Sequence, residues 1–368
     1  MSGQLNKPSS NSAGILNSIN EKGSDLKKIN KTYGLLRKLA SINGINVSNE
    51  ILDRVMYSTE LFPPLGKEYW WLLFFGREGE MPVQLMILIF RKNGQSMIFN
   101  DKKIVLKRLG KNQFQAATAG WIFDGNELHD LGDTNAITTV FPGRKALISE
   151  VTSQEIMLAG GYPNYELKVG NIIDLNMRKG EYLKDCAAHG IFIPPFGMAW
   201  VDVFSEADGI VLGKEFKGTA HLQKVIGIAP FGPFHWGRLF FKNGSSASFF
   251  CLKAGKDSNK YFHRSVNFYD NKQKKIIEFK KPRIKISKKE GKNSVWTIEG
   301  QDADKKIRIV LNSYATKKFI MEGGGSQVYI EYAVTTEEFY LEVSGQKIDL
   351  IDLGRGVGTF EDAYGSPI

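Results

Sequence analysis

Four residues in two adjacent pairs combine the side chains of proton transfer with aromatic rings. They are His235-Trp236, which follow a loop rich in proline, phenylalanine and glycine, and Tyr269-Asp270. A carboxyl group inside an apolar interior keeps its proton because burial disfavours the charged form, so it can serve as a general acid. Imidazole or phenol can orient it, and aromatic faces can stabilise a cation. The same set extends to three late residues, Glu361, Asp362 and Tyr364.

Each pair also fits a purely structural role. His235 suits a hydrogen-bonded histidine of the core, and Asp270 precedes Asn271 as a turn aspartate would. Other chemistries lack their motifs. The five histidines have no metal-ligand spacing, and CxxC, HExxH and GxSxG do not occur. The glycine run 354–358 is followed by no helix that could hold a phosphate. We therefore expect no metal and no cofactor.

Charge and composition indicate the kind of partner and the cellular environment that this protein has. The chain has 368 residues and a formal net charge of +10, which predicts attraction to anionic surfaces. Two cysteines, Cys186 and Cys251, cannot build a disulfide framework, and both lie in apolar surroundings. The first residues lack an apolar signal core, and no stretch has the length of a membrane span. These features predict a soluble, cytoplasmic protein with buried free thiols.

A basic stretch, Lys272–Lys292, holds ten lysines and arginines against two glutamates. Arg283, Lys285 and Ser287 alternate with isoleucines, which places the charges on one strand face. One interpretation is a solvated outer face that protects an edge strand. The other is peripheral docking to anionic membrane. Nucleic acid is a poorer partner because few aromatic residues are interleaved for base stacking.

Turn-separated, strand-length apolar runs fill the chain after about residue 60. Asn93-Gly94, Asp124-Gly125 and Asn243-Gly244 lie between such runs, and Asn-Gly and Asp-Gly are strong hairpin signals. Helical periodicity is confined to residues 24–43 and to a short segment after Ser48 that carries Ile51, Leu52, Val55 and Met56. We interpret these helices as a brace against a sheet. The rest indicates an antiparallel sandwich or barrel.

We divide the chain into three parts: a disordered tail with a helical segment at 1–60, a first β domain at 61–190, and a second at 191–368. The boundary between the two β domains is placed at a break in the pattern of strand-length runs near residues 180–200. No clear sequence repeat relates the two β-rich halves.

A resemblance adds to this picture. The pattern FKGTAHLQKVIGIAPFGPFHWGRLFFKNGSS, with GMAWVDV before it and GVGTFEDAYG near the end, resembles the AttH-like, lipocalin-like proteins. That group includes the carotenoid 1,2-hydratases (hydroxyneurosporene synthases) and is similar to tocopherol cyclases and fungal pericyclase-type lipocalins. Over roughly residues 60–368 the resemblance implies two consecutive lipocalin-like antiparallel β-barrels or half-barrels. It also implies a pocket for a long apolar ligand.

The resemblance implies a site as well. A histidine near a tryptophan and a tyrosine near an aspartate are the catalytic group expected in the hydratases, and His235-Trp236 and Tyr269-Asp270 match them best. In that scheme Asp270 donates the proton, Tyr269 and His235 orient it, and Trp236 shields the cation. Both pairs are adjacent here, whereas the family pattern has one intervening residue. The aromatic residues expected to contact the ligand are Phe231, Phe234, Trp200 and Tyr364.

Two functions follow as alternatives. In the first, the protein binds a large hydrophobic ligand, isoprenoid or lipid, with acid-catalysed hydration or cyclisation of a C=C bond; such an enzyme would be a hydratase-like lyase or an isoprenoid cyclase. In the second, it is a non-catalytic carrier or scaffold that docks to anionic membrane through the basic strand. Ligand binding without product would distinguish the second from the first. The sequence leaves the oligomeric state undetermined.

Overall fold

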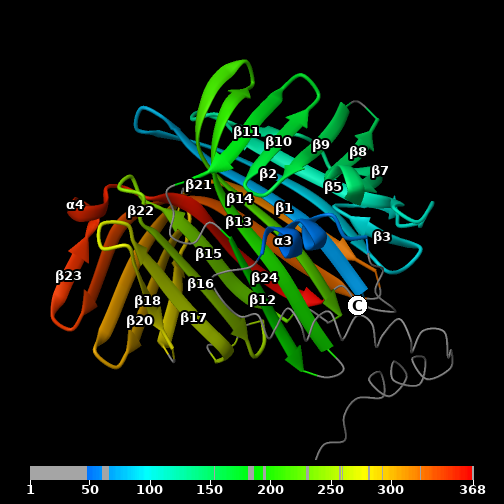
Figure 1. The fold of residues 1–368 in the computed structure, drawn as a ribbon. Helices are drawn as coiled ribbons and strands as arrows, with labels where there is room; N and C mark the ends of the chain where they lie inside the picture. The colour runs from blue at the N-terminus through cyan, green and yellow to red at the C-terminus, as the bar shows by residue number, and fades with distance from the viewer. Residues whose placement is uncertain are drawn as a thin grey trace, which may run out of the picture.

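The structure is a computed structural model, and it is almost entirely antiparallel β (Figure 1). The residues that it describes are 48–59, 66–152, 154–180, 186–193, 196–228, 232–256, 258, 260–280, 282–291, 293–323 and 325–366. The predicted helix at 24–43 lies outside these residues. The all-β prediction is confirmed, with one barrel closed and the second sheet open.

The first sheet closes into an antiparallel barrel of ten strands, because β11 pairs with β13 and completes the ring. Two further strands belong to this sheet outside the ring: β6 pairs with β5, and β12 pairs with β13. The strands of this sheet are β1 (Gly66–Glu78), β2 (Met81–Lys92), β5 (Gln113–Phe123), β6 (Leu128–Asp130), β7 (Thr134–Phe141), β8 (Ala146–Val151), β9 (Gln154–Gly161), β10 (Asn164–Val169), β11 (Ile173–Lys179), β12 (Cys186–Ile193), β13 (Phe196–Val211) and β14 (Lys214–Ile228). A 3-10 turn, η1 (Pro142–Arg144), joins β7 to β8.

The second sheet curves around an apolar core of its own and ends at two edges, β18 and β19. Its strands are β3 (Ser96–Phe99), β4 (Lys102–Val105), β15 (Phe234–Phe240), β16 (Ser246–Lys253), β17 (Tyr261–Asp270), β18 (Lys275–Phe279), β19 (Arg283–Lys289), β20 (Val295–Asp302), β21 (Lys305–Glu322), β22 (Ser326–Val343), β23 (Gln346–Asp349) and β24 (Val357–Ser366). A one-turn helix, α4 (Leu350–Leu353), begins at Asp349, whose carboxylate accepts hydrogen bonds from the first amides.

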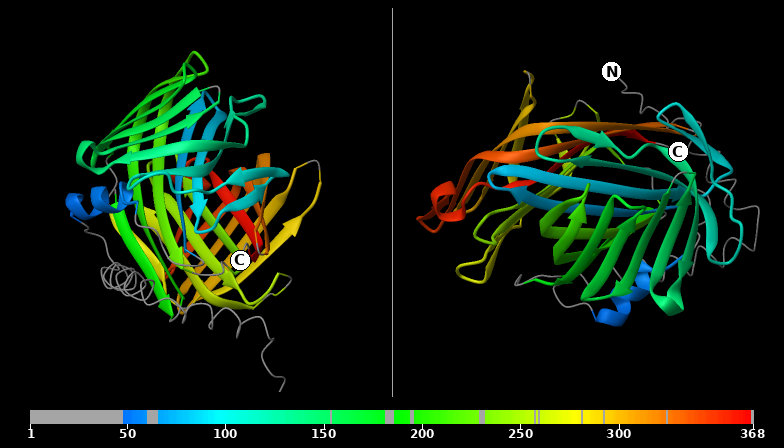
Figure 2. Two further views of the ribbon diagram at one scale, coloured as in Figure 1. Left: turned by 90° about the vertical axis from the view of Figure 1, so that its right-hand side faces the viewer. Right: turned by 90° about the horizontal axis from the view of Figure 1, so that it is seen from above.

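The outer face of the barrel packs against the second sheet. Figure 2 shows the long strands β21 and β22, in orange, running across the blue strands β1 and β2. Side chains of a strand alternate between its two faces. In β1, Trp70 and Leu72 therefore join the barrel core, whereas Trp71 and Leu73 join a second apolar cluster with residues of β21, β22 and β24. This layer between the sheets is called the interface below.

The helix α3 (Asn49–Met56) packs into the core of the barrel, as predicted for a brace. Ser48 caps it by accepting a hydrogen bond from the Ile51 amide. Leu52 and Met56 are fully buried, and the Met56 carbonyl accepts a hydrogen bond of 2.8 Å from the Trp70 indole. This contact fixes the helix to β1.

Asp124-Gly125 and Asn243-Gly244 form hairpin turns, since β5 pairs with β6 and β15 pairs with β16. Asn93-Gly94 does not, because it joins β2 to β3, which belong to different sheets. The glycine of each of the three turns has a positive φ. A two-residue Asn-Gly turn of type I′ needs a positive φ at both residues, but at Asn243-Gly244 only Gly244 has one. The loop is longer than two residues: the Phe241 amide bonds the Ser245 carbonyl, and the Gly244 amide bonds the Phe241 carbonyl. Such a loop needs one left-handed residue and not two.

The chain passes from the barrel to the second sheet between Ile228 and Phe234. Strands β13 and β14 remain in the barrel because they pair with β11 and β1. In the other direction, the β3–β4 hairpin leaves the first half and pairs with β21. Long-range pairings of this kind leave no local mark in the sequence. The three-part domain division itself stays a prediction.

The basic strand is β19, an edge of the second sheet, with Arg283, Lys285 and Lys289 exposed. Charged edges oppose pairing with other chains, so this position fits the first interpretation of the basic stretch. Docking to membrane stays a prediction. In the described part of the chain, no helix has both the length and the apolarity needed to cross a membrane.

Candidate functional site

Two glutamates face each other across neighbouring strands in the interface. Glu331 of β22 and Glu361 of β24 are register partners, and their exposed fractions are 0% and 7%. Directly opposed side chains in an antiparallel pair have Cβ atoms about 5 Å apart. Like charges at that distance in an apolar layer are unfavourable, so such a pair holds protons that isolated carboxyls would release.

The protonation of this pair follows from its surroundings. Burial raises the pKa of Glu331 to about 8. Burial, and then the charge of Glu331, raise the pKa of Glu361 well above its ordinary value. The Thr359 hydroxyl donates a hydrogen bond of 3.1 Å to Glu331, while the second carboxyl oxygen of Glu331 is buried without a partner among the described residues. At neutral pH the pair therefore keeps at least one proton.

A cavity of about 50 Å³ opens beside Glu361. Its lining is mainly aromatic, with one carboxyl and two amide side chains: Tyr69, Trp71, Leu88, Phe90, Gln223, Phe234, Phe319, Met321, Gln327, Tyr329 and Glu361. Tyr329 packs against Trp71 with ring centroids 5.0 Å apart. Burial and the neighbouring Glu361 and Glu331 raise the pKa of Tyr329 well above its ordinary value, so its phenol stays protonated. A protonated acid within an aromatic cavity can donate a proton to an apolar ligand.

A second polar group lies on the barrel side of the interface. The Asp202 carboxylate contacts His221 Nε2 at 2.7 Å and accepts a hydrogen bond of 2.8 Å from the Gln223 amide. Burial opposes ionisation of Asp202, but the hydrogen bond and charge of His221 outweigh it and lower the pKa of Asp202. Burial lowers the pKa of His221. The pair is thus a carboxylate with a neutral imidazole whose Nδ1 has no partner among the described residues.

The imidazole of His221 joins the two sheets. It stacks on Phe204 of β13 at 4.6 Å and on Trp236 of β15 at 5.6 Å between ring centroids. Gln223 connects this group to the aromatic cavity, because it is bonded to Asp202 on one side and lines, together with Glu361, the aromatic cavity on the other.

His235 and Trp236 point to opposite faces of β15, as adjacent strand residues must. Trp236 enters the interface, whereas His235 lies in the core of the second sheet beside Trp296 and Phe360. Lys253 Nζ lies 3.2 Å from His235 Nε2 and 3.0 Å from the Asp362 carboxylate. Burial lowers the pKa of His235, so a neutral imidazole can accept from the lysine.

Tyr269 and Asp270 lie at the far end of the second sheet from His235. Strand registers place His235 beside Cys251 and Arg264, whereas Tyr269 lies beside Ser246. Phe240 pairs with Ser246, and the five residue-to-residue steps from His235 to Phe240 span roughly 17 Å of strand. The Asp270 carboxylate accepts hydrogen bonds from the Lys272 and Gln273 amides, the turn role considered for it.

The structure therefore does not bring the four predicted catalytic residues into one site. Of the predicted ligand contacts, Phe234 lines the cavity beside Glu361. Trp200 stacks on His189, with centroids 5.1 Å apart. Tyr364 lies on the opposite face of β24 from Glu361, with Lys256 4.7 Å from its ring. Phe231 is outside the described residues.

The residues that the sequence reasoning missed are Glu331, Asp202 and His221, and Glu361 was noted without a role. A local signal exists for the glutamate. In VYIEYAV the acidic residue shares a strand face with Tyr329 and Ala333, an arrangement that predicts a buried carboxyl. The partners could not be read from the sequence, because the pairing of β22 with β24 and the packing of β14 on β15 join distant segments.

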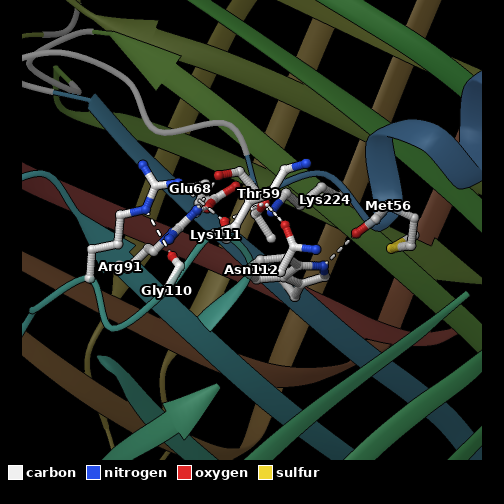
Figure 3. A network of polar contacts seen from close by, with 10 residues as sticks. Met56, Thr59, Glu68, Arg91, Gly110, Lys111, Asn112 and Lys224 are labelled. Carbon is white, nitrogen blue, oxygen red and sulfur yellow. Dashed lines mark hydrogen bonds and ion pairs between the residues drawn. The ribbon is translucent and has the colours of Figure 1, made fainter. Parts of the chain in front are cut away.

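A third buried polar group, inside the barrel, is structural (Figure 3). Glu68 binds Arg91 and also Lys224, whose Nζ lies 2.6 Å from the Glu68 carboxylate and 2.9 Å from the centre of the Trp70 ring. Burial lowers the pKa of Lys224 to about 7. Arg91 thus neutralises Glu68 while Lys224 can lose its charge, and Arg91 also donates to the Thr59 carbonyl at the entry to β1. This network fixes the barrel end.

Asp124, Glu127 and His129 converge at an exposed turn although their spacing in the sequence is not that of a metal motif. Asp124 already accepts hydrogen bonds from the Asn126 and Glu127 amides and contacts His129 at 3.0 Å. Hydrogen bonds within the turn therefore explain why these three side chains lie close together.

Comparison with known proteins gives similarity at the level of structure. No family model matches the chain. No curated protein matches its sequence. Solved structures that it resembles include a candidate AttH protein from Nitrosomonas europaea, with 11% identity, a TM-score of 0.46, and coverage of 80% of this chain and 92% of that one. They also include CghA with Sch210972, with 10% identity, a TM-score of 0.49 and coverage of 84% and 90%.

Kievitone hydratase from Nectria haematococca is a third, with 11% identity, a TM-score of 0.43 and coverage of 88% and 94%. An AttH protein and a hydratase are thus among the solved structures that this chain resembles.

Proposed function

We propose that this protein binds an unsaturated, largely apolar ligand between its two sheets and that Glu361 protonates a C=C bond of that ligand. The observation that carries the proposal is the opposed pair Glu331–Glu361, with Glu361 at an aromatic cavity. Burying two acids in an apolar layer is costly to the fold, and such arrangements are typical of functional sites. Neither carboxyl is neutralised by an ion pair with a described lysine or arginine.

The chemical step balances within the site. The proton of the Glu361 carboxyl adds to one carbon of the double bond, and the π electrons form the new C–H bond. The other carbon becomes a carbocation, and Glu361 becomes a carboxylate. A water molecule adds to the cation, and the resulting oxonium returns its proton to Glu361. The net reaction is hydration of the alkene, and the acid is regenerated. If a second double bond of the ligand attacks the cation, cyclisation results.

The cavity lining suits this intermediate. Trp71, Tyr329 and Phe234 present aromatic faces, which attract cations in sites that exclude water. The neighbouring Glu331 contributes in two ways. In its ionised form it raises the pKa of Glu361, and this raised pKa makes the carboxylate left by the transfer a stronger base. One pair of acids thereby serves both proton transfers.

The size of the cavity limits how a ligand can lie. At about 50 Å³ it is smaller than the ~300 Å³ of sites that enclose a whole small molecule. The reacting end of an isoprenoid fits inside, and the remainder of the chain must leave through the mouth. A fit of this kind selects for a terminal or near-terminal double bond.

The test uses farnesol and geranylgeraniol as probes in water labelled with oxygen-18. Mass spectrometry should detect one labelled water added per product molecule with the wild-type protein. Removing a general acid typically costs 10² to 10⁴ in rate, so we expect Glu361→Gln to reduce turnover at least about 100-fold while binding, followed by tryptophan fluorescence, persists. Glu331→Gln is the matched variant, and we expect a smaller loss because it leaves the donor in place.

Turnover by Glu361→Gln at the wild-type rate would contradict the proposal. Binding of the probes without product in the wild type would favour the carrier alternative. Docking of that carrier to membrane through β19 predicts binding to vesicles of anionic lipid that weakens with added salt.

A further inference from the structure

A second cavity in the interface, of about 80 Å³, lies next to the Asp202–His221 pair. It differs from the aromatic cavity in being lined largely by hydrogen-bonding groups. Its lining residues are His189, Asp202, Phe204, Arg238, Phe240, Ser246, Ser248, Asn267, Tyr269 and Ile276. Tyr269, which the sequence placed in the expected catalytic group, lines this cavity.

Arg238 is the cation of this cavity, and its charge is poorly compensated. Its guanidinium carbon lies 4.5 Å from the centre of the Phe204 ring, and its Nε is buried without a hydrogen-bond partner among the described residues. Burial lowers the pKa of Arg238, and Asp202 acts on it only through its charge. His221 and Gln223 both bond Oδ1 of Asp202, and Oδ2 lies 3.7 Å from His189 Nε2.

Arg238 is half-buried, and a guanidinium that loses part of its solvation without gaining an ion pair carries a cost. The fork of N–H donors on arginine matches a carboxylate in bidentate geometry. Ser246, Ser248 and Asn267 supply further polar groups around the same space. A bound anion would therefore complete a set of partners that the fold leaves open.

We infer that this cavity binds a carboxylate and that the ligand of the interface is an amphipathic carboxylic acid. The identity of that ligand rests on the proposed function, whereas the carboxylate site rests on Arg238 and its cavity. A single guanidinium beside the negative charge of Asp202 suits a monoanion better than a phosphate dianion. The apolar residues Phe204, Phe240 and Ile276 can receive the carbons next to the carboxylate.

The strand register relates the two cavities. Phe234, Trp236 and Arg238 face the interface at successive two-residue steps of β15, each roughly 7 Å. Glu361 is the register partner of Trp236. The carboxylate would therefore lie about one such step from the acid along the strand. The His221–Trp236 stack lies between the cavities, so the ligand chain must pass these rings.

The experiment compares acids with their matched alcohols on the full chain: geranylgeranoic acid with geranylgeraniol, and oleic acid with oleyl alcohol. Affinities are measured by tryptophan fluorescence. A charge-assisted bond from a buried group is typically worth a factor of about 10 to 100. We expect each acid that fits to bind wild-type protein about 10- to 100-fold more tightly than its alcohol. Tighter binding of geranylgeranoic acid would indicate an isoprenoid ligand, and tighter binding of oleic acid would indicate a fatty acid.

Arg238→Gln should abolish the preference for the acid and leave affinity for the alcohol within about threefold. Arg238→Lys keeps the positive charge but loses the bidentate N–H donors, so it should retain part of the preference for the acid. This variant provides the test if Arg238→Gln folds poorly. Arg308→Gln, on the outer surface, is the control and should bind as wild type.

Equal affinity for acids and alcohols in the wild type, or an unchanged preference in both Arg238 variants, would overturn the inference. Glu361→Gln should keep the acid preference even if turnover is lost. Failure of the carboxylate site and failure of the acid catalyst are therefore separate results.

Discussion

Glu361 lies where an ionised side chain is costly, between two packed sheets and opposite a second glutamate. Other buried charges in the chain are compensated differently. Glu68 is bonded by Arg91 and Lys224, and Asp202 by His221 and Gln223. In the glutamate pair the compensation is a proton. That difference supports the proposed role of Glu361 as a proton donor, whereas the Glu68 network stabilises the barrel.

The glutamate pair predicts how stability depends on pH. The pKa of Glu331 is 4.5 in the unfolded chain and about 8 in the folded one. Below pH 4.5 both states are protonated, and its favourable contribution is complete. As pH rises toward 8 the unfolded state releases the proton first, so the free energy of unfolding falls. One pKa unit is about 1.4 kcal/mol, which gives a loss of up to roughly 4 to 5 kcal/mol.

Denaturant unfolding of the wild type and of Glu331→Gln at several pH values between about 4.5 and 8 checks this expectation. The variant should lose less stability across that range and should exceed the wild type at the upper end. Part of the slope should remain, because burial still raises the pKa of Glu361. Parallel slopes for the two proteins would contradict a raised pKa at Glu331.

At the level of elements, β24 positions the acid. It pairs with β15 on one side and β22 on the other, so Trp236, Glu361 and Glu331 form one row across three strands. Gly358 allows the close approach of β24 to β15, because a Cβ there would overlap the Arg238 carbonyl oxygen. The site therefore depends on a residue that takes no part in it.

Gly358→Ala should destabilise the protein by about 1 to 3 kcal/mol, since overpacking against backbone cannot be relieved by a rotamer change. It should also reduce turnover by shifting Glu361. Gly143→Ala is the control: its Cβ would have no neighbour within 4 Å, and the expected change is within about 0.5 kcal/mol. Thermal unfolding of both variants measures the difference, and equal stabilities would show that the approach of β24 is not limiting.

Sequence patterns predict some of these elements well. Alternating apolar residues and the glycines of the hairpin turns indicate the strands, and Ser48 with the spacing of Leu52 and Val55 indicates α3. The sequence pattern therefore places His235 and Trp236 on a strand. Because it does not show which strands pair, it predicts neither their partners nor the row of Trp236, Glu361 and Glu331 across three strands.

In the whole molecule, each sheet has an apolar core of its own, and the candidate site belongs to the layer between them. Polar residues in that layer come from both sheets: Asp202 and Gln223 from the barrel, and Arg238 and Glu361 from the second sheet. The sequence predicted a ligand inside a barrel. The candidate residues of this site lie between the two sheets, because folding brings together residues that are far apart in the chain.

The central claim, that Glu361 carries a proton near neutral pH, can be measured directly. Infrared difference spectra of the wild type against Glu361→Gln separate the C=O stretch of a protonated carboxyl from the bands of a carboxylate. Between about pH 6 and 7, where an exposed glutamate is ionised, we expect a protonated carboxyl signal that the variant lacks. A difference spectrum that shows only carboxylate at these pH values would contradict it.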